Sequence, residues 1–151
     1  MKKWQEDLAN QSYDDYYERL DDLAYIAGYE RTDEGLYSKL TQKGYIEYDL
    51  KELQFRTNFN WLMGLFAQIN LHDKYWNIYI TNRQVLIANE YKSTHTMFAY
   101  TYTHINELTR ALFLAISDYA KIRRNSKDYP ELRQKHLDKL EENYKKNNSD
   151  I

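Results

Sequence analysis

The chain has 151 residues, 42% of them hydrophobic, and a formal net charge of −2. This length predicts a single domain with a real core. There is no cysteine, which excludes disulfide bonds and thiolate metal sites, and no apolar run approaches the roughly 20 residues of a transmembrane helix. With no signal-peptide pattern at the start either, we expect a protein of a reducing cytoplasm.

Charge is distributed unevenly along the chain. Residues 1–34 contain four Lys or Arg and ten Asp or Glu, whereas residues 35–124 contain eleven basic and seven acidic residues. An independent nucleic-acid-binding domain usually has a strong positive surplus, because phosphate neutralisation supplies much of its affinity. That surplus is missing. The sixteen tyrosines indicate either a binding surface, where tyrosine is enriched, or the codon bias of an AT-rich genome.

The first predicted element is a helix over residues 2–27. Apolar residues recur there at helical spacing, and Gly28 follows where a left-handed residue commonly ends a helix. Acidic residues, among them Asp14, Asp15 and Glu18, cover the opposite face. They form either a solvated face or a surface that docks on a basic partner. Residues 29–56 look irregular, with at most a short edge strand in residues 45–55.

A short apolar helix is predicted over residues 58–69. Asn58 can cap it by accepting backbone N–H groups of the first turn, and its buried stripe follows at i, i+3, i+4 and i+7 (Leu62, Leu65, Phe66 and Ile69). Trp61 borders this stripe, so we interpret it as part of the core rather than of a ligand site. Gly64 interrupts the helix, which suggests close packing at that point.

Three segments with period-2 alternation follow, at residues 74–81, 85–91 and 96–103. Short polar connectors between them predict an antiparallel meander. The period then returns to helical for a long helix that Thr103 is expected to cap. The predicted fold class is therefore α+β: a three-stranded antiparallel meander packed with helices, plus a charged C-terminal helix. Residues 1–124 would form the domain and residues 125–151 the tail.

The tail is expected to be a helix that faces solvent. Asp128 and Glu131 make a capping pair in the sequence, and Pro130 falls in the first turn, where its missing N–H is tolerated. Its apolar content is thin. We expect it to pack loosely, to pair with a partner, or to fray.

No residue cluster specifies a reaction. The four histidines have no metal-binding spacing, no nucleophile-elbow sequence is present, and four glycines are too few for a phosphate-binding loop. We therefore predict a non-enzymatic protein without metal or cofactor. The candidate partner or nucleic-acid contacts are a basic cluster at the end of the long helix, two strand tyrosines and the acidic residues above (Lys121, Arg123, Arg124, Lys127, Tyr100, Tyr102, Asp14, Asp15 and Glu18).

The basic cluster and the strand tyrosines can each be explained without a binding partner. Cations at a helix C-terminus are favoured by the helix dipole without any ligand. The face with Phe98, Tyr100 and Tyr102 could stack bases if exposed, but is core if helices cover it.

Three stretches carry a family resemblance: LAYIAGY (23–29), NFNWLMGLFAQI (58–69) and LTRALFLAISDYAK (108–121). Together with the order of helix, meander and helix, they resemble the phage ABA-sandwich domain family over roughly residues 20–123. These are small proteins of phages and prophage-bearing bacteria. The resemblance implies a mobile-element setting and brings no catalytic residues with it.

Setting and composition together predict a phage-derived protein that binds a host protein or ribonucleoprotein. The expected function is inhibition of a host macromolecular complex, with a CRISPR effector or its guide RNA as the particular target. The alternative is a small RNA-binding or RNA-modulating module. Neither hypothesis requires a membrane or a small-molecule cofactor.

Overall fold

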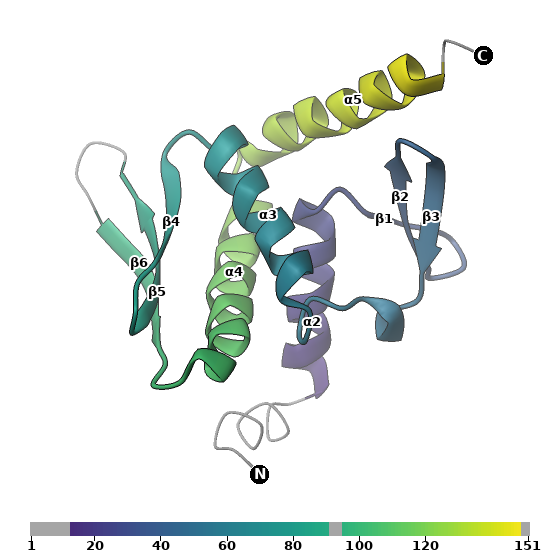
Figure 1. Cartoon of the computed structure of the whole chain (residues 1–151). Coiled ribbons are helices and arrows are strands. Elements are labelled where there is room, and N and C mark those ends of the chain that lie inside the picture. Colours follow the sequence, from purple (N-terminus) through teal and green to yellow (C-terminus); the bar gives the residue numbers. More distant parts are fainter. Residues whose placement is uncertain (1–12, 91–94, 149–151) are drawn as a thin grey trace.

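The computed structural model describes residues 13–90 and 95–148, and Figure 1 shows their arrangement. Helices α2, α3 and α4 lie between two three-stranded antiparallel sheets, and α5 crosses one end (Figure 1). The elements are α2 (Tyr13–Ile26), β1 (Glu30–Arg31), β2 (Tyr37–Thr41), β3 (Gly44–Tyr48), the 3-10 turn η1 (Leu50–Glu52), α3 (Phe59–His72), β4 (Trp76–Ile80), β5 (Gln84–Asn89), β6 (His95–Thr101), the 3-10 turn η2 (Ile105–Glu107), α4 (Leu108–Arg124) and α5 (Tyr129–Asn148). The predicted α+β class, with its meander, its helices and its charged C-terminal helix, is confirmed.

Helix α2 ends where the sequence predicts. Gly28 adopts a positive φ of 95°, and the backbone N–H groups of Gly28 and Tyr29 donate to the carbonyls of Tyr25 and Ala24 at 3.2 and 2.9 Å. This is the Schellman arrangement, in which a left-handed residue lets the chain satisfy the last carbonyls of the helix. The predicted start of this helix, residues 2–12, lies outside the described residues.

The sheet β1-β2-β3 is mostly unpredicted. Its edge strand β3 overlaps residues 45–55 and confirms the short edge strand expected there, whereas β1, β2 and the pairing of the three strands were not expected. Strands β2 and β3 form a hairpin that pairs Tyr37 with Tyr48 and Thr41 with Gly44, and Gly44 adopts a positive φ of 116°. The two-residue strand β1 pairs with β2. The segment looked irregular because its strands are short and only half-buried, so the alternation of apolar and polar residues is weak.

Helix α3 confirms the predicted cap at Asn58. The Asn58 Oδ1 accepts the backbone N–H groups of Asn60 and Trp61 at 3.0 and 3.4 Å. Leu62, Leu65 and Ile69 are buried, as expected. Gly64, however, is exposed, and a Cβ there would meet nothing within 4 Å. The expectation of close packing at Gly64 is wrong.

The meander and the long helix form the other half of the core. The inner face of β4-β5-β6 carries Trp76, Ile78, Val85 and Ile87, which pack with α4 side chains such as Phe113. A bulge between Ile87 and Ala88 shifts the alternation. Helix α4 begins at Leu108, after η2, and the Thr103 hydroxyl donates to the Glu107 carboxylate at 3.1 Å. The predicted Thr103 cap is therefore wrong, because this turn separates it from the helix.

Helix α5 contacts the rest of the fold near both of its ends. Tyr129 is buried, and the Arg133 guanidinium donates to the carbonyls of Tyr25 and Tyr29 at 2.9 and 2.7 Å. Further along, the side-chain amide of Asn148 donates to the Gln42 carbonyl at 3.1 Å. The helix thus spans from the end of α2 to the β2–β3 turn. The boundary between residues 124 and 125 stays a prediction.

Trp61 lies at the border of the core. Its ring packs against Phe55 and Tyr48, with ring centroids 5.1 and 5.5 Å away, yet it is only partly buried, and part of it lines a cavity. The expectation that Trp61 belongs to the fold holds for one side of the ring, while its other side is open.

Candidate functional site

The predicted basic cluster is not a free surface. Arg123 is buried, 5% exposed, and its guanidinium makes paired hydrogen bonds to Asp73 (2.7 and 3.1 Å) and to Asp128 (2.9 and 3.0 Å). Burial alone opposes its charge, but the hydrogen bonds to Asp128 and Asp73 outweigh it and raise the pKa of Arg123. Both hydrogen-bonding edges of the Arg123 guanidinium are therefore occupied within the fold, and its role in a binding patch stays a prediction.

Arg124 is also held within the fold. It donates to Asp21 at 2.6 Å and to Asp22 at 3.1 Å, and it lies over the ring of Tyr25. Burial by itself would raise the pKa of Asp21. The hydrogen bonds from Tyr37 and Arg124 together outweigh this effect, so the pKa of Asp21 is lowered. For Asp22 burial prevails and the pKa is raised. Of the predicted cluster, Lys121 and Lys127 are exposed.

The strand tyrosines face the helices rather than solvent. Tyr102 is buried and donates its hydroxyl to the Thr81 carbonyl. Tyr100 is partly buried and donates to the Asp118 carboxylate, and burial with that hydrogen bond raises the pKa of Tyr100 to about 12. These contacts bear out the core interpretation of this face and leave no row of rings on which bases could stack.

The acidic residues of α2 are only partly available. Glu18 is exposed, whereas Asp21 and Asp22 pair with Arg124. Asp14 and Asp15 lie within α2, but their side chains are outside the described residues. Among the predicted contact residues whose side chains the structure describes, Glu18 and Lys121 line one small pocket, and the others do not join them there.

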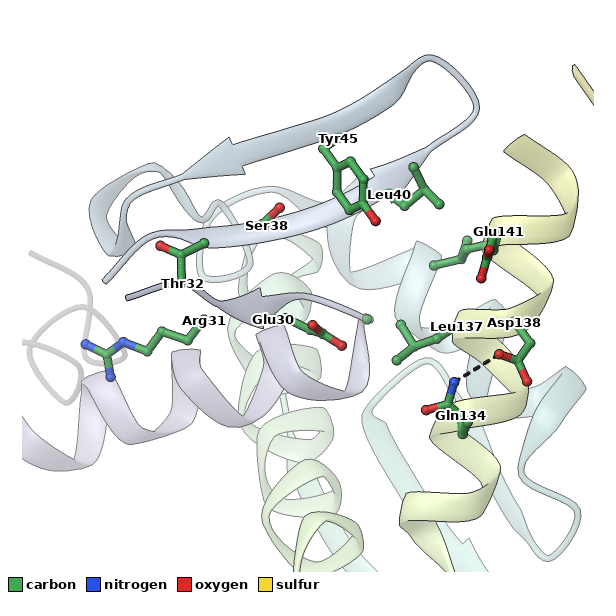
Figure 2. A pocket seen from close by; sticks show the side chains of 12 residues that line it. Glu30, Arg31, Thr32, Ser38, Leu40, Tyr45, Gln134, Leu137, Asp138 and Glu141 are labelled. Carbon is green, nitrogen blue, oxygen red and sulfur yellow. Dashed lines mark hydrogen bonds between the residues drawn. The ribbon is translucent and has the colours of Figure 1, made fainter. Parts of the chain in front are cut away.

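A surface groove lies between sheet β1-β2-β3 and α5 (Figure 2). Side chains alternate along β2, so Ser38 and Leu40 face this groove, whereas Tyr37 and Lys39 face the interior. Tyr45 pairs with Leu40 across the hairpin and joins the same face. Helix α5 supplies the opposite wall. The groove has a volume of about 400 Å³, within the range typical of ligand pockets.

The groove combines an apolar middle with an acidic rim. Its apolar residues are Leu40, Tyr45, Leu137 and Leu140, and Tyr45 is 74% exposed. Its carboxylates are those of Glu30, Asp138 and Glu141, while Arg31 extends away from α5 in Figure 2.

Neighbouring groups restrain these carboxylates. The side-chain amide of Gln134 donates to Asp138 at 2.9 Å. Glu30 and Glu141 have the cations of Arg133 and Lys145 at 3.9 and 3.0 Å. Such exposed pairs contribute little and can exchange for a partner's cation.

An exposed aromatic ring, aliphatic side chains and carboxylates in one groove can contact a segment of another macromolecule. No group of three or more metal-ligating side chains occurs in residues 13–90 and 95–148. Within the same residues, no helix is long and apolar enough to cross a membrane. The groove was not predicted because its wall requires strand β2 and the β2–β3 hairpin, which the sequence pattern did not indicate. The signals that point to it are Gly44 as a hairpin turn and the spacing of Leu137 and Leu140 on a charged helix.

The fold is α+β, and the groove combines apolar side chains with carboxylates. Comparison with family models finds no match, and comparisons with curated proteins and solved structures find none either.

Proposed function

We propose that this chain is a phage-derived, non-enzymatic binding protein that inhibits a host macromolecular complex, and that a CRISPR effector is the particular target. The observation that carries the proposal is the groove between α5 and sheet β1-β2-β3, with the exposed Tyr45 and the half-buried Leu137 beside three carboxylates. An exposed aromatic ring beside aliphatic side chains and a polar rim is the usual composition of a protein-binding surface.

The negative charge of this surface indicates a partner with a positively charged surface. Glu18 on α2 and Glu30, Asp138 and Glu141 at the groove present carboxylates outward. Complementary charge accelerates association and selects partners. We therefore expect the groove to contact a basic surface, such as the protein surface that a nucleic-acid-binding complex uses for its own ligand.

The proposal is tested by affinity capture from a lysate of the natural host, followed by an interference assay. Wild-type protein should recover a stoichiometric protein or ribonucleoprotein, and its expression should restore plating of a phage that the host's CRISPR system targets. The variant Asp138→Lys/Glu141→Lys should lose both properties. The control is Glu131→Lys/Glu142→Lys, the same charge change at exposed positions of α5 outside the groove lining. Recovery of nothing by the wild-type protein would end this proposal.

RNA binding is the second proposed function, with narrower support. Among the predicted contacts, the exposed lysines Lys121 and Lys127 are its remaining basis. A filter-binding titration at two salt concentrations tests it. Retention that weakens steeply with salt and falls further in Lys121→Gln/Lys127→Gln favours RNA binding. No retention at low salt removes it.

A further inference from the structure

A second hollow lies on the inner side of the sheet whose outer side forms the groove. It has a volume of about 210 Å³ and is lined by Ala27, Tyr29, Lys39, Phe55, Asn60, Trp61, Gly64, Leu65 and Gln68. It lies between α3 and strand β2, and the period-2 alternation of β2 places Lys39 in it.

Lys39 places a positive charge at this cavity. Among the described residues, no carboxylate lies within ion-pair distance of its ammonium, whose contact is the ring of Tyr29, with 5.4 Å between nitrogen and ring centroid. Burial lowers the pKa of Lys39, because a low-dielectric site disfavours the charged form. A partly desolvated cation without a counter-ion is an unfavourable arrangement, which an anion in the cavity would relieve.

The walls around this cation are aromatic. Trp61 and Phe55 meet edge-on, with ring centroids 5.1 Å apart and an interplanar angle of 79°. Gln68 is fixed, since its side-chain amide donates to the Ile26 carbonyl at 2.6 Å. At Gly64 the absence of a side chain leaves open space, as no atom lies within 4 Å of a Cβ built there. An aromatic ring could therefore enter beside Trp61 and stack or meet it edge-on.

The number of cations limits the charge of the ligand. One ammonium, assisted by the amide groups of Asn60 and Gln68, suits a carboxylate; phosphate dianions are usually bound by several charged donors or a helix N-terminus. The volume limits the ligand to about one ring, since it is below the range of drug-sized sites.

We propose that this cavity binds a small aromatic carboxylate, with the carboxylate on the Lys39 ammonium and the ring against Trp61 and Phe55. The proposal is independent of the partner bound at the outer groove, because it concerns the opposite face of the sheet. It assigns Trp61 a ligand contact in addition to its part in packing.

Benzoate is the test ligand, and benzamide is its neutral counterpart of nearly the same shape. In calorimetric titrations, we expect benzoate to bind at about millimolar concentration and benzamide to bind at least about tenfold more weakly. The indole N–H signal of Trp61 in nitrogen–proton NMR spectra, identified with Trp61→Phe, should shift with benzoate.

Lys39→Met is the decisive variant, and Lys43→Met, at the exposed hairpin turn, is its control. Lys39→Met should abolish the preference for benzoate while leaving the melting temperature unchanged or higher, because it removes an unpaired charge. Lys43→Met should keep the preference. Equal binding of benzoate and benzamide, no binding of either at about 10 mM, or equal effects of the two lysine variants would overturn the proposal.

Discussion

Arg123 and Asp73 form a buried ion pair with two hydrogen bonds, Nε to Oδ2 at 2.7 Å and Nη2 to Oδ1 at 3.1 Å. Asp73 follows the last residue of α3, and Arg123 lies in the last turn of α4. The other edge of the guanidinium binds Asp128, directly before α5. The Tyr119 hydroxyl also donates to Asp73. One guanidinium therefore joins the ends of two helices to the start of a third.

Replacement of Arg123 by Ala should lower the free energy of unfolding by about 3–5 kcal/mol, because it leaves the Asp73 carboxylate buried without its cation. Urea denaturation followed by circular dichroism measures this. Lys121→Ala, an exposed change in the same helical turn, should shift the value by no more than about 0.5 kcal/mol. The basic-patch hypothesis predicts a small effect for Arg123 as well, so equal stabilities of the two variants would restore it.

His136 should make stability depend on pH. Burial, together with the charges of Lys39 and His72, lowers the pKa of His136 to about 4 from an ordinary 6.5. Between pH 6.5 and about 4 the unfolded chain therefore binds a proton at this histidine that the folded chain does not. Proton binding favours the unfolded state, so the free energy of unfolding decreases as the pH falls through this range.

The measurement is the free energy of unfolding at several pH values in this range. In His136→Leu the decline should be shallower, because the buried imidazole, whose Nε2 has no hydrogen-bond partner among the described groups, is gone. His104→Leu, at an exposed position, should decline like the wild type. Identical profiles for all three proteins would show that His136 titrates normally in the folded state.

Two glycines should respond oppositely to replacement by Ala. Gly28 has a φ of 95°, and a Cβ there would meet His136 and Leu140 at 3.4 Å, so Gly28→Ala should destabilise the fold by about 1–2 kcal/mol. Gly64 lies in helix α3 with nothing within 4 Å, so Gly64→Ala should stabilise it by about 0.5–1 kcal/mol. Melting temperatures compared with the wild type check both signs. A loss of stability at Gly64 would mean that the helix packs more closely there than its open surroundings indicate.

The two described tryptophans should differ in their contribution to stability. Trp76 is 5% exposed, and its ring lies edge-on to Tyr119 with centroids 5.3 Å apart, so Trp76→Ala should cost about 3–5 kcal/mol. Trp61 is partly open to the cavity, and its replacement should cost roughly half as much. Chemical denaturation of both variants decides this. A cost at Trp61 equal to that at Trp76 would place its ring fully inside the core.

The strongly periodic parts of the chain were predictable from the sequence. The cap at Asn58, the end of α2 at Gly28 and the three strands of the meander each have local causes, in side-chain hydrogen bonding, in φ preference and in alternating burial. The hairpin β2–β3 escaped prediction because strands of five residues with half-buried side chains carry little periodic signal.

The candidate site was not predictable in the same way. Arg123 and Arg124 lie among basic residues in the sequence, but their carboxylate partners lie up to 103 positions away. Their proximity in the sequence therefore suggested a basic surface patch, whereas in the folded protein both arginines form ion pairs with aspartates of the same chain. The groove likewise joins β2 to α5, about 100 residues apart, so its walls meet only after folding.

Arg133 gives this architecture a practical consequence for any shortened version of the protein. Its guanidinium donates hydrogen bonds to the carbonyls of Tyr25 and Tyr29 at the end of α2. A chain cut after residue 124 would lose both hydrogen bonds, together with the helix that supplies them. We therefore expect such a shortened chain to be less stable at the C-terminal end of α2 than the full-length protein.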